Sequence, residues 1–181
     1  MTTREAAALL RGHNHILILT HRRPDGDTVG CGAALCVALR QLGKTAWMLY
    51  NPDITDTNGV YAQGLWAPED FVPEFVVAVD IAARSLFFPG SEQYIDRVDL
   101  AVDHHPSQEF FAAQTCLEAD KAACGEIVYE ICRELGEITP QVALPLYAAI
   151  STDTGCFVYA NTTANTHRVA AALIDTGIDY F

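Results

Sequence analysis

The segment HILILTHRRPDGDTVG, residues 15–30, joins an apolar run to a polar loop and then to the start of a helix. Residues 15–20 show no polar alternation, which predicts a strand buried on both faces. The helix is expected over residues 28–42, and Gly43 is a typical C-terminal stop. Because a buried strand followed by a helix is the repeating unit of parallel sheets, this segment predicts an α/β fold.

Short apolar runs alternate with longer helical patterns along the rest of the chain. The apolar runs predict further strands over residues 45–50, 75–79 and 99–102. Helices are expected over residues 2–10, 122–135, 139–152 and 163–176, and a loop that can hold one short helix over residues 51–73. We therefore expect residues 1–181 to form one domain with a mostly parallel central sheet, flanked by helices on both faces.

Composition and charge exclude several classes of protein. No stretch approaches the roughly 20 apolar residues that cross a bilayer, and the N-terminus lacks the apolar core of a signal peptide, so we expect a soluble, cytoplasmic protein without a membrane partner. The net charge of −12 argues against binding to long double-stranded DNA. The six cysteines form no C-x-x-C pair and are expected to be reduced, mostly buried thiols.

The polar loop after the first predicted strand contains two acidic residues separated by a glycine. In an extended turn the carboxylates of Asp25 and Asp27 can point the same way, and His21 precedes them within reach of the same ion. The amides at the start of the following helix face this place, which suits a phosphate group. Taken alone, the loop is more typical of an Asp that caps a helix, because Asp is common at helix starts.

Three further polar clusters lie at the ends of predicted elements. Asp80 ends one apolar run, Asp103, His104 and His105 end another, and Asp153 lies at the end of a helix. Taken singly, Asp80 and Asp153 are also typical of turns. A continuing strand would point the two histidine rings to opposite sides, so only one of them would normally serve a given ion.

Together the clusters provide four carboxylates and at least two imidazoles. The carboxyl ends of parallel strands meet at one edge of a sheet, so these side chains are expected to lie close together. Carboxylate and imidazole ligands suit manganese better than a structural zinc site, which favours thiolates. Two such ions can stabilise the charge of a phosphoryl group during an in-line displacement. The alternative is that all the clusters are caps and turns.

These segments resemble the motifs of the DHH phosphoesterases. The similarity looks strongest to the nanoRNase-type branch with a RecJ-like DHH domain, whose bacterial members degrade short oligoribonucleotides and remove phosphate from 3′-phosphoadenosine 5′-phosphate. Each motif is weak alone, but the motifs occur in the order of the family and span nearly the whole chain. The matching segments cover residues 20–27, 79–80, 102–105, 152–155 and 159–163.

The resemblance implies a function and a set of site residues. It implies metal-dependent hydrolysis of short oligoribonucleotides or 3′-phosphoadenosine 5′-phosphate with two Mn²⁺, for which Mg²⁺ or Co²⁺ could substitute. One ion would be bound by His21 and Asp25, a second by Asp27, His104 and Asp153, and both would be bridged by Asp80. The catalytic group would comprise Asp80, His105 and Asp103.

Further roles follow from the same resemblance. His105 would contact the scissile phosphate, and Asp103 would orient the site from outside the ligand set. The segment around Thr162 and the side chain of Arg168 would line the edge of the site. A helix-capping role for Thr162 or Thr163 is an equal alternative.

The chain departs from the family pattern in one respect, and other functions stay open. Members of the family carry a C-terminal substrate-binding domain with a glycine-rich, basic segment, which we do not find here. We expect either a piece of a longer protein or a single-domain relative, and a homodimer is compatible with both. The alternatives are a manganese inorganic pyrophosphatase, whose first motif typically reads Asn-Pro-Asp-Thr-Asp, and a non-catalytic metal- or nucleotide-binding module. Here the motif is Arg-Pro-Asp-Gly-Asp.

Overall fold

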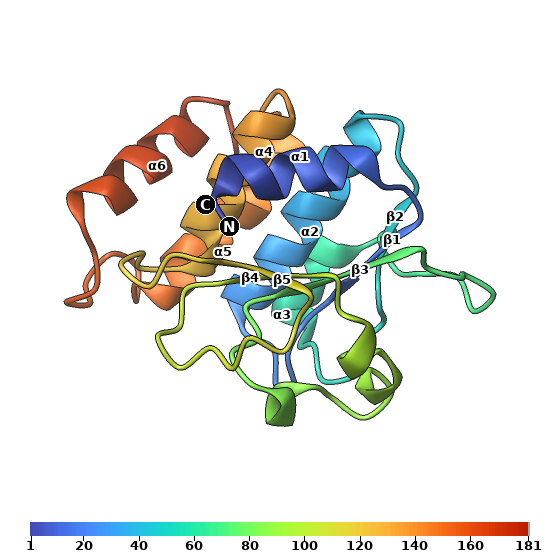
Figure 1. The fold of residues 1–181 in the computed structure, drawn as a ribbon. Helices are drawn as coiled ribbons and strands as arrows, with labels where there is room; N and C mark the ends of the chain where they lie inside the picture. The colour runs from blue at the N-terminus through green and yellow to red at the C-terminus, as the bar shows by residue number, and fades with distance from the viewer. Residues whose placement is uncertain (181) are drawn as a thin grey trace.

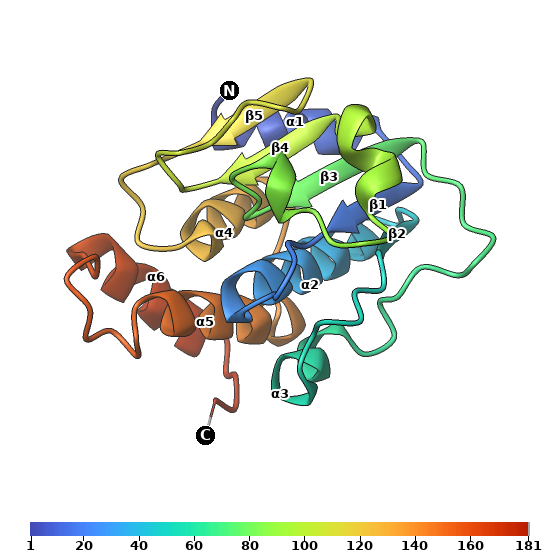
Figure 2. The ribbon, with the colours of Figure 1, turned by 90° about the horizontal axis from the view of Figure 1, so that it is seen from below.

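The computed structural model describes residues 1–180, so only Phe181 of the predicted domain lies outside it. Five strands form one sheet in the order β2-β1-β3-β4-β5, and every neighbouring pair is parallel (Figure 1 shows the sheet edge-on and Figure 2 its strands side by side). The predicted α/β fold is therefore confirmed. The strands are β1 (Ile16–Leu19), β2 (Ala46–Met48), β3 (Phe75–Val79), β4 (Leu100–Asp103) and β5 (Gln114–Leu117).

The three central strands are apolar because both of their faces are covered. Every residue of β1, β3 and β4 is buried, which explains why their sequences do not alternate between apolar and polar residues. In the register of the sheet Leu19 pairs with Ala78, and Val79 pairs with Val102. The carboxyl ends of these strands therefore lie at one edge of the sheet.

The α-helices gather on one face of the sheet, as Figure 2 shows for α2, α4 and α5. Ile16, Ile18 and Val77 pack into the large hydrophobic core beneath these helices. The opposite face, with Leu17 and Val76, is covered by 3₁₀ helices and loops, so the predicted helical cover of this face is limited to short 3₁₀ helices. The helices are α1 (Thr3–Gly12), α2 (Gly26–Gln41), α3 (Asp56–Gly59), α4 (Cys124–Leu135), α5 (Pro140–Asp153) and α6 (Ala164–Ile174), with the 3₁₀ helices η1 (Val60–Ala62), η2 (Arg84–Leu86) and η3 (Glu92–Arg97).

The strand order places a topological switch between β1 and β3. From β1 the chain passes through α2 to β2 on one side, whereas β3, β4 and β5 follow on the other side. Connections leave the two neighbouring strands in opposite directions, which opens a crevice at their carboxyl ends. The polar motifs after β1 and β3 therefore meet where parallel α/β sheets usually bind ligands.

Helices α2 and α5 are packed closely enough to require a glycine. A Cβ atom on Gly30 would lie 2.3 Å from the carbonyl oxygen of Pro145 and 2.9 Å from the Cβ of Ala149. A Cβ on Gly26 would lie 2.5 Å from the Oγ1 of Thr152. This close approach positions the first turn of α2 beside the last turn of α5.

Most predicted elements are confirmed, and the differences have local causes. The capping box between Thr2 and Glu5 is present at the start of α1. Helix α2 begins at Gly26 rather than near residue 28, because the Asp25 side chain accepts the amides of the first turn. Strand β5 was not predicted, since it is short and only Cys116 within it is buried.

Two predictions from composition can be compared with the structure. Five of the cysteines are buried free thiols, as expected, whereas Cys156 is exposed. Across residues 1–180 the structure contains no helix that is both long and apolar enough to cross a membrane.

Candidate metal centre

The predicted ligands come together at the carboxyl edge of the sheet, although they come from distant parts of the chain. The loop after β1 supplies His21 and Asp25, and the first turn of α2 supplies Asp27. Asp80 and His104 directly follow β3 and β4, and α5 supplies its last residue. The structure therefore brings together one set of six side chains: His21, Asp25, Asp27, Asp80, His104 and Asp153.

One group of ligand atoms is formed by His21, Asp25 and Asp80, all within 4.8 Å of one another. The Nε2 of His21 lies 3.6 Å from Asp25 Oδ1 and 3.5 Å from Asp80 Oδ2. Its Nδ1 lies 2.8 Å from the carbonyl oxygen of Arg22, which accepts a hydrogen bond from the ring. This contact fixes the ring so that Nε2 faces the carboxylates.

A second group is formed by Asp27, His104 and Asp153. The Nε2 of His104 lies 3.3 Å from Asp153 Oδ2 and 3.9 Å from Asp27 Oδ2. On the other side of the ring, Nδ1 lies 3.1 Å from the carbonyl oxygen of Lys121. Both candidate histidine ligands thus donate Nδ1–H to a backbone carbonyl, as metal-binding histidines usually do.

Asp80 lies between the two groups and is only 3% exposed. Its Oδ2 faces His21, whereas its Oδ1 lies 3.6 Å from His104 Nε2. Within residues 1–180 the buried Asp80 Oδ1 and His104 Nε2 have no hydrogen-bond partner. Leaving such atoms without a partner is costly, and a divalent cation would satisfy both. The donor set therefore fits two cations that share Asp80.

The backbone at Asp80 is unusual. Its φ of +59° lies in the left-handed region, which residues other than glycine rarely adopt. The Asp80 amide still donates a hydrogen bond of 2.8 Å to the carbonyl of Val102 in β4. This conformation turns the side chain into the site directly at the end of β3, and strained backbone of this kind is concentrated at functional sites.

Asp27 is fully buried and is held by the start of α4. Its Oδ2 accepts the Cys124 amide at 2.7 Å, and its Oδ1 accepts the Gly125 amide at 2.9 Å. The amides at the start of a helix favour a negative charge. A Cβ on Gly125 would lie 3.3 Å from Asp27 Oδ1, so a small residue suits this contact. The sequence carries no sign of these contacts, because the donors are backbone groups.

His105 is oriented by Asp103. The His105 Nδ1 lies 2.8 Å from Asp103 Oδ1 and 3.5 Å from Asp80 Oδ1, and the side chain is 43% exposed. Asp103 is buried, and its Oδ2 accepts a hydrogen bond of 2.7 Å from the Nε2 of Gln108. Gln108 was not predicted, since nothing in its local sequence distinguishes it.

The expectation that the rings of His104 and His105 point to opposite sides is wrong. Their centroids lie 4.4 Å apart, and both rings contact the region around Asp80. Strand β4 ends at Asp103, whose Oδ1 accepts the amides of both following residues. The chain turns there, so the alternation of a strand no longer applies.

The residues predicted at the edge of the site have different environments. Thr163 caps α6, because its side chain accepts the amides of Asn165 and Thr166, so the capping alternative is confirmed for this residue. The buried Oγ1 of Thr162 has no hydrogen-bond partner in the part of the chain that the structure describes. Arg168 is exposed on α6. Substrate contacts of Thr162 and Arg168 stay a prediction.

The packed carboxylates change the acid–base properties of the site. Burial raises the pKa of Asp27 well above its ordinary value, and the charges of Asp80 and Asp153 add to this effect. Burial and the charge of Asp80 raise the pKa of Asp153 to about 6. Burial disfavours a charge on His21, but hydrogen bonds to Asp25 and Asp80 outweigh it and raise its pKa to about 10. Without a metal, protons therefore compensate part of the negative charge.

We expect the metal-free protein to lose stability as the pH rises from about 5 to about 8. Asp153 and His21 both have a higher pKa in the folded protein than in the unfolded chain, with reference values of 3.8 and 6.5. The folded state therefore binds more protons between pH 3.8 and about 6 through Asp153, and between pH 6.5 and about 10 through His21. Stability consequently falls with pH in both windows.

Thermal unfolding in a chelator and in Mn²⁺, at about pH 5 and about pH 8, checks this prediction. The ions must displace protons at the lower pH, so Mn²⁺ should raise the midpoint more at the higher pH. An equal rise at both pH values would contradict the assignment of these groups to the metal centre.

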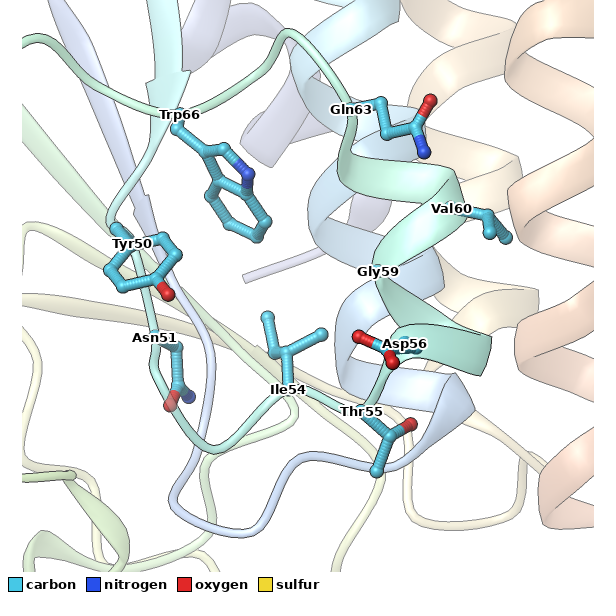
Figure 3. A pocket seen from close by; sticks show the side chains of 9 residues that line it. All are labelled: Tyr50, Asn51, Ile54, Thr55, Asp56, Gly59, Val60, Gln63 and Trp66. Atoms are coloured by element: carbon cyan, nitrogen blue, oxygen red, sulfur yellow. The ribbon is translucent and has the colours of Figure 1, made fainter.

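A concave pocket of about 450 Å³ lies beyond the end of β2 and is lined by residues outside the candidate ligand set. Tyr50 and Trp66 lie on one side of it, with Ile54 between them and the short helical segment that carries Asp56 (Figure 3). The two aromatic rings meet edge to face at 5.5 Å. The lining residue Asn51 donates hydrogen bonds of 3.0 Å from Nδ2 to Thr20 Oγ1 and to the carbonyl of His21, which connects the pocket wall to the metal centre.

Comparison with known proteins gives a consistent family match. The family model described as "DHH family, N-terminal domain" matches residues 15–150. The chain is 33% identical over 168 residues to the Thermus thermophilus protein named bifunctional oligoribonuclease and PAP phosphatase NrnA. This match covers 90% of the chain and 50% of that protein, so the chain spans about half the length of this relative.

Two solved structures share the fold at low sequence identity. An exopolyphosphatase-related protein from Bacteroides fragilis has a TM-score of 0.81 at 19% identity, over 98% of this chain and 57% of that chain. The exonuclease RecJ bound to manganese has a TM-score of 0.59 at 15% identity, over 98% of this chain and 47% of that chain. Both likenesses concern the architecture of the chain.

Proposed function

Because the chain belongs to the DHH family, we propose that it is a two-metal phosphoesterase that hydrolyses a nucleotide phosphate ester. The substrate would be a short oligoribonucleotide or 3′-phosphoadenosine 5′-phosphate. The observation that carries this proposal is the position of Asp80 between two groups of ligand atoms, with a buried carboxylate oxygen that has no partner among residues 1–180.

In this proposal His21 and Asp25 would hold one Mn²⁺, and Asp80 would contribute to the binding of both ions. Mg²⁺ or Co²⁺ could take the same positions, since carboxylate and imidazole ligands accept all three. When bound, the two ions stabilise the charge that develops on the phosphoryl oxygens. The second ion would be held by Asp27, His104 and Asp153.

His105 would bind the phosphoryl group directly. The hydrogen bond to Asp103 is the main cause that raises the pKa of His105. The raised pKa favours the protonated ring. With Nδ1 facing Asp103, the ring can donate a hydrogen bond from Nε2 to a phosphoryl oxygen. Asp103 would act through His105 as a positioning residue, and Gln108 would hold Asp103 in turn.

A nucleotide is favoured over pyrophosphate by the pocket that Asn51 connects to the backbone of His21. Tyr50 and Trp66 offer aromatic surface on which a base can stack, and the polar side chains of Asp56 and Gln63 line the same pocket. Pyrophosphate has no group that would use such a surface. The name of the Thermus thermophilus relative supports the same substrate class. We propose that the chain is one catalytic domain, to which the second domain found in longer members would add substrate contacts.

We expect the purified chain with Mn²⁺ to release adenosine monophosphate from 3′-phosphoadenosine 5′-phosphate, or mononucleotides from a short RNA. Removing the metal with a chelator should abolish the release, and adding Mn²⁺ should restore it, because the carboxylates otherwise repel the substrate. Mass spectrometry of the products, with pyrophosphate as a third substrate, distinguishes the candidate functions. Cleavage of pyrophosphate alone would favour a pyrophosphatase, and metal binding without any turnover would favour a non-catalytic module.

A further inference from the structure

Arginines gather around a second pocket, which begins next to the metal centre. This pocket has a volume of about 440 Å³, and its lining includes Arg22, Arg23 and Arg84. Arg22 directly follows the candidate ligand His21, and its carbonyl oxygen accepts the hydrogen bond from the ring of that histidine. The chain has only 11 basic residues against 23 acidic ones, whereas this pocket is lined by three arginines and two acidic residues, Asp53 and Glu92.

Two of the three arginines have no ion-pair partner among residues 1–180. Arg84 forms an ion pair with Asp96. By contrast, no carboxylate of residues 1–180 lies within 4.0 Å of the guanidinium of Arg22 or Arg23. Asp53 lines the same pocket, but its Oδ2 lies 3.5 Å from the backbone amide of Arg23. The two guanidinium groups are exposed and keep most of their donors available.

The backbone that carries these arginines is held in place. The Arg22 amide donates a hydrogen bond of 2.7 Å to the carbonyl of Leu86, and its Nη1 lies 3.4 Å from the carbonyl of Ser85. Arg23 has a φ of +51°, a left-handed conformation that costs free energy for a residue with a side chain. The preceding carbonyl of His21 accepts the hydrogen bond from Asn51. These contacts hold the backbone of Arg22 and Arg23 in place beside the candidate ligand His21.

We propose that Arg22 and Arg23 form a subsite for a second, non-scissile phosphate of the substrate. This inference rests on the proposed function, since it assumes that the phosphate to be hydrolysed lies at the metal centre. Guanidinium groups match the geometry of phosphate oxygens and bind them with paired hydrogen bonds. The preferred ligand class is a nucleotide with a phosphate on each side of one nucleoside, such as a nucleoside 3′,5′-bisphosphate or the first linkage of a short RNA.

Kinetics with two adenosine substrates test the subsite. Adenosine 3′,5′-bisphosphate and adenosine 3′-monophosphate share the ester to be cleaved, but only the first carries the second phosphate. In the full chain with Mn²⁺, the double variant R22Q/R23Q should raise the KM for the bisphosphate about 10- to 100-fold. The kcat/KM for the monophosphate should change by no more than about twofold, because the scissile group does not contact the arginines.

A matched control removes the same charge elsewhere. The double variant R4Q/R133Q replaces Arg4, which lies on α1 near Glu134, and Arg133, which lies on α4 near Glu130. It should leave the KM of both substrates unchanged within about twofold. A similar rise in KM for both variants would show a general charge effect and overturn the subsite, as would an equal loss of kcat/KM on both substrates.

A binding measurement separates this inference from the proposed function. Adenosine 5′-monophosphate, the expected product, carries the phosphate that the arginines would hold, whereas adenosine does not. Calorimetric titration of the Mn²⁺-loaded chain should show weaker binding of the monophosphate to R22Q/R23Q and unchanged binding of adenosine. If the native chain cleaves neither substrate but shows this difference, the proposed function fails, whereas the phosphate-binding role of the two arginines stands. Equal binding of the monophosphate to native and variant chains overturns the subsite.

Discussion

Replacing Asp80 by asparagine is expected to lower Mn²⁺-dependent turnover by about 1,000-fold or more. Asp80 faces both groups of ligand atoms, so the change removes the one carboxylate that the two proposed ions share. Asparagine is chosen because it tolerates the left-handed backbone found at this position, which alanine would strain. The loss should therefore come from the missing charge rather than from a rearranged loop.

Turnover and calorimetric metal titration check this expectation. The Asp80→Asn variant should lose at least one of the two Mn²⁺ binding events. The matched control is Asp70→Asn, which removes the same charge from an exposed residue in the loop that precedes β3. The shared-ligand role would be refuted if Asp80→Asn binds two ions and keeps roughly a tenth or more of the native activity.

The Gly30→Ala variant is expected to lose about 2 to 3 kcal/mol of stability. The added methyl group would lie 2.3 Å from the carbonyl of Pro145 and 2.9 Å from the Cβ of Ala149, so α2 and α5 must move apart. For a domain of this size the loss corresponds to a decrease in Tm of roughly 5–10 °C. The same movement should separate Asp27 from Asp153 and weaken metal binding.

Thermal unfolding with and without Mn²⁺ measures both effects. Gly12→Ala is a suitable control, because nothing lies within 4 Å of the added atom and the position has no positive φ. This control should keep the native Tm within about 1–2 °C. If Gly30→Ala also unfolds at the native temperature, the contact between α2 and α5 is softer than the structure indicates.

Much of the fold can be predicted from the sequence because its central strands are buried on both faces. The continuous apolar runs of β1 and β3 stand out from their surroundings, and the helices between them have clear caps and stops. By contrast, β5 lies at the edge of the sheet and has a single buried residue, Cys116, so its pattern does not differ from that of a loop. Prediction was strongest where burial leaves a continuous apolar pattern.

The sequence predicts the candidate metal ligands, but it does not predict the groups that hold these ligands in place. Asp80 and His104 lie directly at strand ends, where a parallel sheet is known to gather ligands. The amides of Cys124 and Gly125, which hold Asp27, have no side-chain signature. The same applies to Lys121, whose carbonyl orients His104. Such partners depend on the packing of α4 against α2, which no local pattern reveals.

Because Asp27 is anchored to the start of α4, metal binding and folding of the domain should be cooperative. The candidate ligands extend from His21 to Asp153, so no short fragment of the chain contains a complete site. Metal binding would therefore draw on the folding of almost the whole domain, and would link α2, α4 and α5 into one unit. Amide hydrogen exchange in these three helices should then slow together on addition of the ion, rather than in the loops beside it alone.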